Sequence, residues 1–212
     1  MIALAGMVMA AQSFDLRMRP ISKPVVFETV EDRKDGKEHT VLGTRFELSV
    51  GQDLAANLTM GPYSSMGRTF GHPRTRRLSL TPQGTLRGDP YGRPPFLLSL
   101  PLPGHVIKVG DFWTASLVGP TPMPAGVKAA FHALGFTTMA GAKCMRVGIR
   151  LDTEFGGARI TGKGEIAVRL ADGLDQKGSL DVLMVYHRPD QRTHQIVESA
   201  RVTIAATIRR AL

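Results

Sequence analysis

Apolar and polar residues alternate along most of this chain, and a period of two is typical of β-strands that bury one face. Near the start, Phe14, Leu16 and Met18 alternate with charged residues. The same alternation is present near the end of the chain, where Val202, Ile204 and other apolar residues share one face. Strands are therefore predicted over residues 13–19, 25–30, 40–50, 112–117, 127–136, 143–152, 160–170, 180–186 and 196–208.

Short segments rich in glycine and proline separate these strands, so sequence neighbours are expected to pair antiparallel. Asp35-Gly36 is predicted as the tip of the first hairpin, because both central positions of a type I′ turn need positive φ. Further turns are predicted at Pro82-Gln83-Gly84, Ala140-Gly141, Asp172-Gly173 and Pro189-Asp190. Residues 54–60 fit a short helix or a strand, and residues 61–77 have no period and are predicted as a long loop.

The predicted fold is all-β: one strongly curved antiparallel sheet, half-barrel or sandwich-like. Residues 89–103 contain five prolines, which excludes a helix and favours an extended connection. We expect an N-terminal β half over 12–88, a connection over 89–105 and a C-terminal β half over 106–212, in one compact domain. Residues 78–88 resemble 168–178, so the halves are either an old duplication or two hairpins of ordinary appearance.

The C-terminal half carries a recognisable series of motifs. Val-Gly-Asp-Phe-Trp at 109–113 precedes a strand, then Ala-Gly-Ala-Lys-Cys at 140–144 and a glycine-rich strand that ends at Asp172-Gly173-Leu174. This series resembles a family of uncharacterised bacterial exported β-rich proteins. The resemblance implies export and a curved half-barrel sheet as in lipoprotein-carrier folds, and it implies no known activity.

Residues 2–11 form an apolar run that ends in small residues, with Val8 and Ala10 spaced as at a signal-peptidase site. The run is too short to span a bilayer and lacks a basic segment before it. Either residues 1–11 are the remnant of a longer signal peptide, or they are an ordinary N-terminus. We expect export to the periplasm or the cell exterior. The one cysteine, Cys144, lies in a predicted strand, where a small buried side chain is expected.

The formal net charge of +9 is concentrated in the middle of the chain. Six arginines gather between positions 68 and 93, interleaved with aromatic residues: Arg68, Arg74, Arg76, Arg77, Arg87 and Arg93. Such a segment either is a solvated basic loop or attracts an anionic partner. Because an exported protein seldom meets nucleic acid, anionic lipid or envelope polysaccharide is the preferred partner.

Motifs for catalysis or cofactor binding do not stand out. Residues 157–163 match most of a phosphate-binding loop, but Gly164 replaces the Ser or Thr, and strands on both sides leave no helix to face a phosphate. His187 and His194 are a weak candidate metal pair, facing each other if the turn between them has a two-residue tip at Asp190-Gln191. We therefore expect no cofactor, no metal and no enzyme activity. The carboxylates of Asp172 and Asp175 are expected to be solvated at a turn.

Two functions remain. The first is a non-enzymatic exported envelope protein that binds or carries an apolar or amphiphilic ligand in a concave sheet rich in methionine and aliphatic residues. The second is a structural or adhesive module that docks on anionic surfaces through residues 68–93. A carrier needs an open apolar cavity, whereas a module has a closed core. Trp113 is expected to close one end of that core.

Overall fold

The computed structural model describes residues 13–84, 86–87, 101–117, 123–124, 126–190, 192 and 195–211. These residues form strands joined by turns, with no helix among them. The strands are β1 (Ser13–Asp15), β2 (Val25–Asp35), β3 (Glu38–Val50), β4 (Ala55–Ser65), β5 (Arg68–Phe70), β6 (Arg74–Leu80), β7 (Leu86–Arg87), β8 (Val106–Lys108), β9 (Phe112–Leu117), β10 (Val127–Met139), β11 (Ala142–Phe155), β12 (Ala158–Arg169), β13 (Asp175–Pro189) and β14 (Ile196–Arg210).

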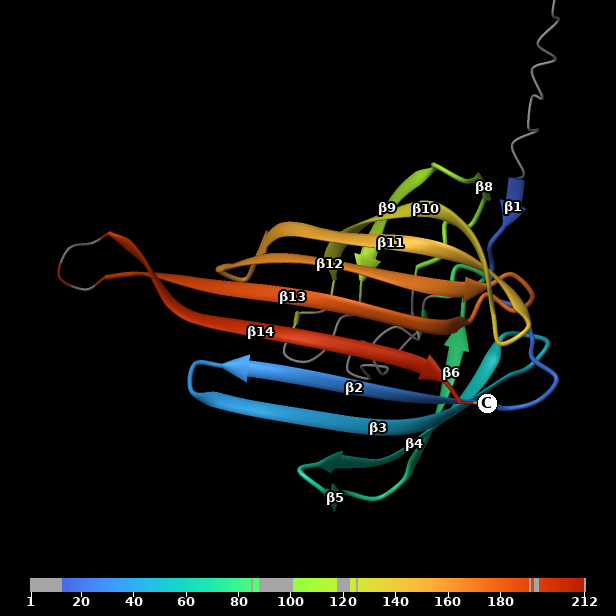
Figure 1. The fold of residues 1–212 in the computed structure, drawn as a ribbon, viewed down its shortest axis with the longest axis horizontal. Helices are drawn as coiled ribbons and strands as arrows, with labels where there is room; N and C mark the ends of the chain where they lie inside the picture. The colour runs from blue at the N-terminus through green and yellow to red at the C-terminus, as the bar shows by residue number, and fades with distance from the viewer. Residues whose placement is uncertain are drawn as a thin grey trace, which may run out of the picture.

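Eleven of these strands form one antiparallel sheet in the order β7-β6-β4-β3-β2-β14-β13-β12-β11-β10-β9, with β5 added beside β4. The sheet is strongly curved and does not close, because β7 and β9 remain as its two edges (Figure 1). A separate two-stranded sheet pairs β1 with β8. The predicted all-β fold with one curved antiparallel sheet is confirmed.

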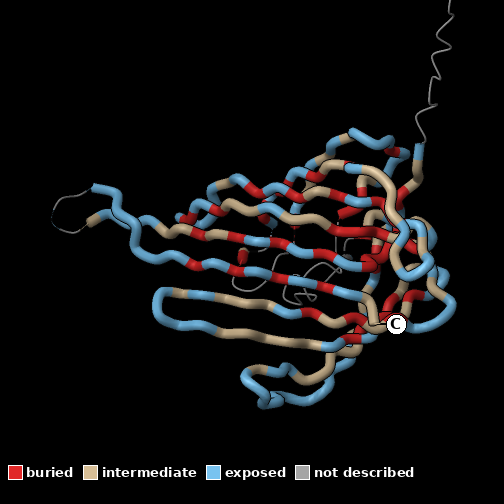
Figure 2. Tube along the Cα trace, in the orientation of Figure 1, coloured by how far each residue is buried: buried red, intermediate tan, exposed pale blue. Residues whose placement is uncertain are grey.

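The alternation in the sequence explains which face of each strand is buried. Along β11, Met145, Val147, Ile149 and Leu151 are buried and the residues between them are more exposed. The same alternation runs along β13 and β14 (Figure 2). We call the face with the buried side chains the inner face and the opposite one the outer face.

Tight turns connect the long strands, and most of the turn residues with positive φ are glycines. Ala140 and Gly141 both have positive φ, at 48° and 73°, as a type I′ turn requires. The first hairpin differs from the prediction. Its pairing ends at Asp35 and Glu38, so Gly36 and Lys37 are the central residues, and only Gly36 has positive φ, at 58°. Glycine at the first central position is the signature of a type II′ turn.

The prediction of a long loop over 61–77 is wrong. β4 begins at Ala55 as a strand and continues to Ser65, and β6 then pairs with it antiparallel from Arg74 onward. The alternation was hidden for two reasons. Between the pairs Thr44–Tyr63 and Phe46–Met60 the register shifts, so β4 holds one extra residue that interrupts its period of two. Arginines also occupy inward positions of β6.

The N-terminal and C-terminal segments share this single sheet. β14 pairs with β2 over nine residue pairs, from Val202 with Asp35 to Arg210 with Phe27. Strands from both ends of the chain therefore lie side by side in the middle of the sheet (Figure 1). Most of the proline-rich connection and the proposed signal remnant lie outside the described residues. The proposed duplication stays a prediction.

Candidate functional site: the inner face of the sheet

The inner face presents a continuous apolar surface across the C-terminal strands. One row of paired residues illustrates it, since the register joins Trp113, Phe131, Ile149, Gly164, Leu180 and Ala206 across β9 to β14. Trp113 stacks on Phe131 with ring centroids 5.4 Å apart, and its indole Nε1 donates to the carbonyl of Pro101 at 2.8 Å. Trp113 is thus packed against the core at the β9 edge, as the sequence predicts.

Chain outside the large sheet covers part of this face. Five of its side chains belong to the same buried core as the sheet: Leu16, Met18, Leu102, Ile107 and Met123. Backbone hydrogen bonds tie these covering segments to one another, from Met18 to Pro82 and from Leu102 to Gln83, each at 2.8 Å. We call residues 13–19, 81–84 and 101–108 the cover.

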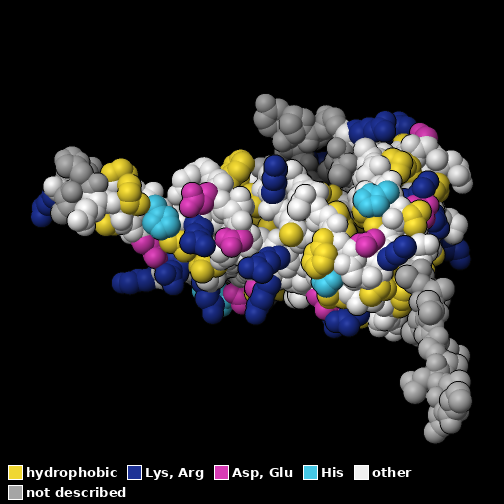
Figure 3. Space-filling view, turned by 90° about the horizontal axis from the view of Figure 1, so that it is seen from above, with side chains coloured by type: hydrophobic (Ala, Val, Ile, Leu, Met, Phe, Trp, Pro, Cys, Tyr) yellow, Lys and Arg dark blue, Asp and Glu magenta, His cyan; other side chains and the backbone are white. Residues whose placement is uncertain are grey.

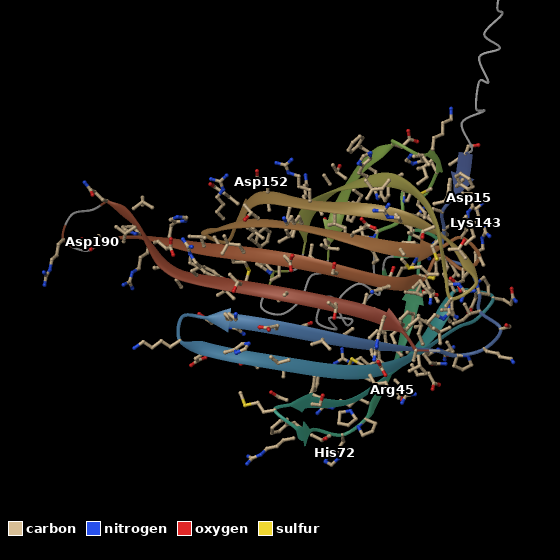
Figure 4. All side chains as sticks on the ribbon, viewed as in Figure 1. Asp15, Arg45, His72, Lys143, Asp152 and Asp190 are labelled. Carbon is tan, nitrogen blue, oxygen red and sulfur yellow. The ribbon has the colours of Figure 1, made fainter. Side chains whose placement is uncertain are left out.

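The cover contacts the sheet at its β10 side. Phe14 of β1 packs on Phe136 of β10, with ring centroids 4.2 Å apart. The ammonium of Lys143 lies 5.2 Å from the Phe136 ring and 5.8 Å from the Phe14 ring. Asp15 and Lys143 lie at this same end of the molecule (Figure 4). The face alternation predicted for residues 13–19 holds, although only Ser13–Asp15 pair as a strand.

The inner face becomes polar along β2. The apolar row continues from Ala206 to Glu31, and burial raises the pKa of the Glu31 carboxyl above its usual value. Two positions further on, Nη2 of Arg33 lies 2.7 Å from Oδ2 of Asp35 in an ion pair. The inner face therefore combines a wide apolar floor with a titratable group and an ion pair at one end.

The described part of this face is closely packed. Phe27, Phe131, Ile160 and Leu180 are all 0% exposed. A hollow of about 840 Å³ lies instead on the outer face, lined by outward side chains such as Arg150, Lys163 and Asp181. An apolar ligand on the inner face would therefore have to displace the cover.

The basic segment predicted from the sequence is built into strands, and its arginines divide between the two faces. Arg77 pairs with Asn57 and Arg87 pairs with Ser79, which puts both on the outer face. Arg74 and Arg76 face inward, at the positions of Met60 and Leu58 in the adjacent strand. Arg68 is exposed on β5. Arg93 lies outside the described residues.

The turn after Pro189 is longer than the two-residue tip that would bring His187 and His194 together. The β13–β14 hairpin pairs Pro189 with Ile196, so six residues form its loop, and His187 lies opposite Glu198. His194 lies outside the described residues. Among the described residues, no group of three or more His, Cys, Asp or Glu could hold a metal ion.

The segment that resembles a phosphate-binding loop is a β-hairpin. Gly156 and Gly157 are its tip, both with positive φ, and the chain enters β12 directly afterwards. Cys144 is buried in β11, and burial is the main cause of the raised pKa of its thiol.

One expectation about the acidic residues is wrong. Asp172 and Asp175 are 7% and 4% exposed, not solvated. Their burial arises from the ends of β12 and β14, which converge on the turn, and the sequence pattern gives no signal of that convergence.

No helix in the described part of the chain has the length and hydropathy that a membrane span needs.

Comparison with known proteins gives little to build on. No protein-family model matches the chain, and no curated protein matches it. Among solved structures, it is similar to a DUF1329 family protein from Desulfovibrio piger, at 10% identity and a TM-score of 0.23, over 88% of this chain and 85% of that one. It is also similar to a Vibrio parahaemolyticus domain described as an outer membrane lipoprotein-sorting protein, at 10% identity and a TM-score of 0.22, over 89% and 83%. Superpositions this poor carry no argument about function, and the family resemblance drawn from the sequence stays a prediction.

Proposed function

We propose that this chain is a non-enzymatic, exported protein of the bacterial cell envelope that binds an apolar or amphiphilic ligand against the inner face of its sheet. One observation carries the proposal: a wide apolar sheet face is covered, within the described residues, by the short β1–β8 sheet and irregular chain. Irregular segments held by few hydrogen bonds open at lower free energy than packed sheets or helices do.

The polarity of the inner face favours an amphiphile over a plain hydrocarbon. An acyl chain fits the apolar row from Phe131 to Ala206. A polar headgroup then falls near Glu31, whose carboxyl pKa is raised by burial, and near the Arg33–Asp35 ion pair. Buried polar groups need hydrogen-bonding partners, and a headgroup supplies them.

The test is native mass spectrometry of the protein purified gently from a periplasmic host, before and after organic extraction. We expect a bound mass that extraction removes. The extracted protein should then bind 1-N-phenylnaphthylamine with a rise in fluorescence, and short-chain phospholipids should displace the probe. A bare protein mass together with no probe fluorescence would refute ligand carriage.

A second candidate is docking on anionic surfaces, favoured by the exposed outward arginines Arg77 and Arg87 at the β6–β7 edge. Such binding weakens with salt, because it replaces counterions at both surfaces. Co-sedimentation with vesicles of phosphatidylglycerol and phosphatidylcholine should then fall in the double variant R77Q/R87Q. The variant R150Q removes an arginine from the outer face of β11 and is the matched control. Equal sedimentation of the two variants would refute docking through this edge.

A further inference from the structure

A polar cluster lies where β12 and β14 finish, at the opposite end from the protruding β13–β14 loop. Oδ2 of Asp172 lies 3.2 Å from Nη1 of Arg210 and 3.6 Å from Nη1 of Arg169. Its Oδ1 accepts a hydrogen bond from the backbone N–H of Leu174 at 3.0 Å. One carboxylate thus serves two guanidinium groups whose side chains are only 17% and 24% exposed.

Burial disfavours the charged form of the second carboxyl of the cluster, that of Asp175. Asp175 is fully buried, and burial, together with the neighbouring charge of Asp172, holds its pKa well above the usual value. Within the described part of the chain, the buried Oδ2 of Asp175 and the buried Nε of Arg169 find no hydrogen-bond partner. Because buried polar atoms are normally paired, an unused guanidinium donor here calls for an acceptor.

A hollow of about 620 Å³ opens beside this cluster, bounded by residues 20–26, by Arg45 of β3 and by the ends of β12 and β14. Its charged lining residues are Lys23, Arg45, Arg169, Arg210 and Asp172. A second hollow of about 340 Å³ also touches Arg169 and Arg210. Figure 4 places Arg45 on β3, near the end of the sheet at which β14 finishes.

Four cations against one carboxylate leave this hollow with an excess of positive charge. Two guanidinium groups on one side of a cavity repel each other unless an anion lies between them, and Asp172 balances one of them. Each guanidinium has five donors in a planar fork that matches the oxygens of a phosphate group. Asp172 uses one nitrogen of each.

We propose that the hollow formed by Lys23, Arg45, Arg169 and Arg210 binds a phosphate group. A phosphate monoester carries about 1.5 to 2 negative charges at neutral pH and several strong acceptor oxygens. It matches both the charge excess and the number of free donors better than a single carboxylate does. The inference does not depend on the proposed inner-face ligand, because the residues that line this hollow are not those of the apolar row or of its polar end.

The test is isothermal titration calorimetry of the whole chain with sodium phosphate, against sodium chloride at equal ionic strength. We expect saturable phosphate binding and none with chloride. Arg45 is exposed, so the variant R45Q should fold as the wild type does, checked by its melting temperature. Losing one charge-assisted hydrogen bond should weaken phosphate binding about tenfold.

The matched control is R150Q, which removes an exposed arginine from the outer face of β11 and should leave phosphate binding unchanged. K23Q provides a second variant, expected to weaken binding in the same direction as R45Q. Equal affinities of R45Q, K23Q and R150Q, or no saturable binding by the wild type, would overturn the proposal.

The source of the phosphate is settled by a further titration with dihexanoyl phosphatidic acid. If the site takes a lipid headgroup, this compound binds more than about tenfold tighter than inorganic phosphate, and R45Q weakens both. If it takes a soluble phosphate ester, the short acyl chains give no advantage. Failure of the inner-face probe assay leaves this experiment unaffected, so the two proposals fail separately.

Discussion

Gly173, in the turn between β12 and β13, lies directly against the backbone of Arg17. A side-chain carbon on Gly173 would overlap the carbonyl of Arg17 and approach the nitrogen of Met18 at 2.9 Å. The backbone N–H of Arg19 also donates to the carbonyl of Asp172 at 3.1 Å. The cover is therefore fitted to this turn by close backbone packing, and only glycine leaves room for it.

The variant G173A should destabilise the protein. Gly173 has a φ of 71°, so alanine adds left-handed strain to the overlap with Arg17. We expect a loss of about 2–4 kcal/mol in the free energy of unfolding, measured by urea denaturation. The control is G36A, whose position has positive φ but nothing within 4 Å of the added carbon. It should lose only about 1 kcal/mol, and an equal loss in both variants would contradict the close packing.

The variant D175N should stabilise the protein near neutral pH. The folded-state pKa of Asp175 is raised, mainly by burial, so the folded state holds this proton more tightly than the unfolded state does. The stabilisation that the protonated Asp175 contributes to the folded state is fully present below the unfolded-state pKa of about 3.9. It is lost as the pH rises through the folded-state pKa. Asparagine has no proton to lose.

The measurement for D175N is the melting temperature from pH 4 to pH 8. We expect little difference in stability from the wild type at pH 4 and a gain of about 1–3 kcal/mol at pH 8, because asparagine removes the cost that the buried ionisable carboxyl imposes above its unfolded-state pKa. A difference that does not change with pH would show that the effect of the substitution is not electrostatic.

The variant D172N should make the protein depend on anions. It removes the charge that serves both Arg169 and Arg210, and it should lower the melting temperature in a low-salt buffer without phosphate. Added phosphate should then raise the melting temperature more than it does for the wild type. The variant E165Q breaks an exposed ion pair with Arg146 and should change stability by less than about 1 kcal/mol, with or without phosphate.

The variant L16A should speed entry of a probe onto the inner face. Leu16 is 1% exposed in the cover, so truncation weakens the cover by about 2–5 kcal/mol without changing the floor of the sheet. Stopped-flow binding of 1-N-phenylnaphthylamine should become faster. Leu48, 2% exposed on β3, offers the matched control L48A, which is destabilised in the same way but retains its cover. Equal acceleration of both variants would mean that the probe enters through general unfolding.

The sequence predicts the C-terminal strands well, because there the alternation is regular and the turn residues meet strict requirements. Ala140-Gly141 is an example, where two positive φ angles place the hairpin within one residue. The prediction of a loop over 61–77 is wrong, because Arg74 and Arg76 occupy inward positions at which an alternating strand pattern has apolar residues. At the Pro189 turn the sequence leaves the loop length open, because loop length, not strand period, sets the register of a hairpin.

The polar cluster could not be predicted at all. Asp172 and Asp175 stand at a glycine turn, where a charged residue normally meets water. They are buried because Arg169 and Arg210 finish their strands beside them. Arg210 is 38 residues from Asp172 in sequence but adjacent to it in space, and Arg169 is three residues away. The ends of β12 and β14 meet because of the order of the strands in the sheet, and a local sequence pattern does not predict that order.

The pairing of β14 with β2 also governs when the fold can be completed. The ion pair between Glu28 and Arg209 joins positions 181 residues apart. During synthesis, β2 can pair with β3 early, but it can pair with β14 only after almost the whole chain has left the ribosome. Contacts this distant in sequence form slowly. The pairing of β14 with β2, in the middle of the sheet, is thus the last to form. Late completion of the sheet would favour the export that we propose, because a translocation channel accepts a chain that has not yet folded.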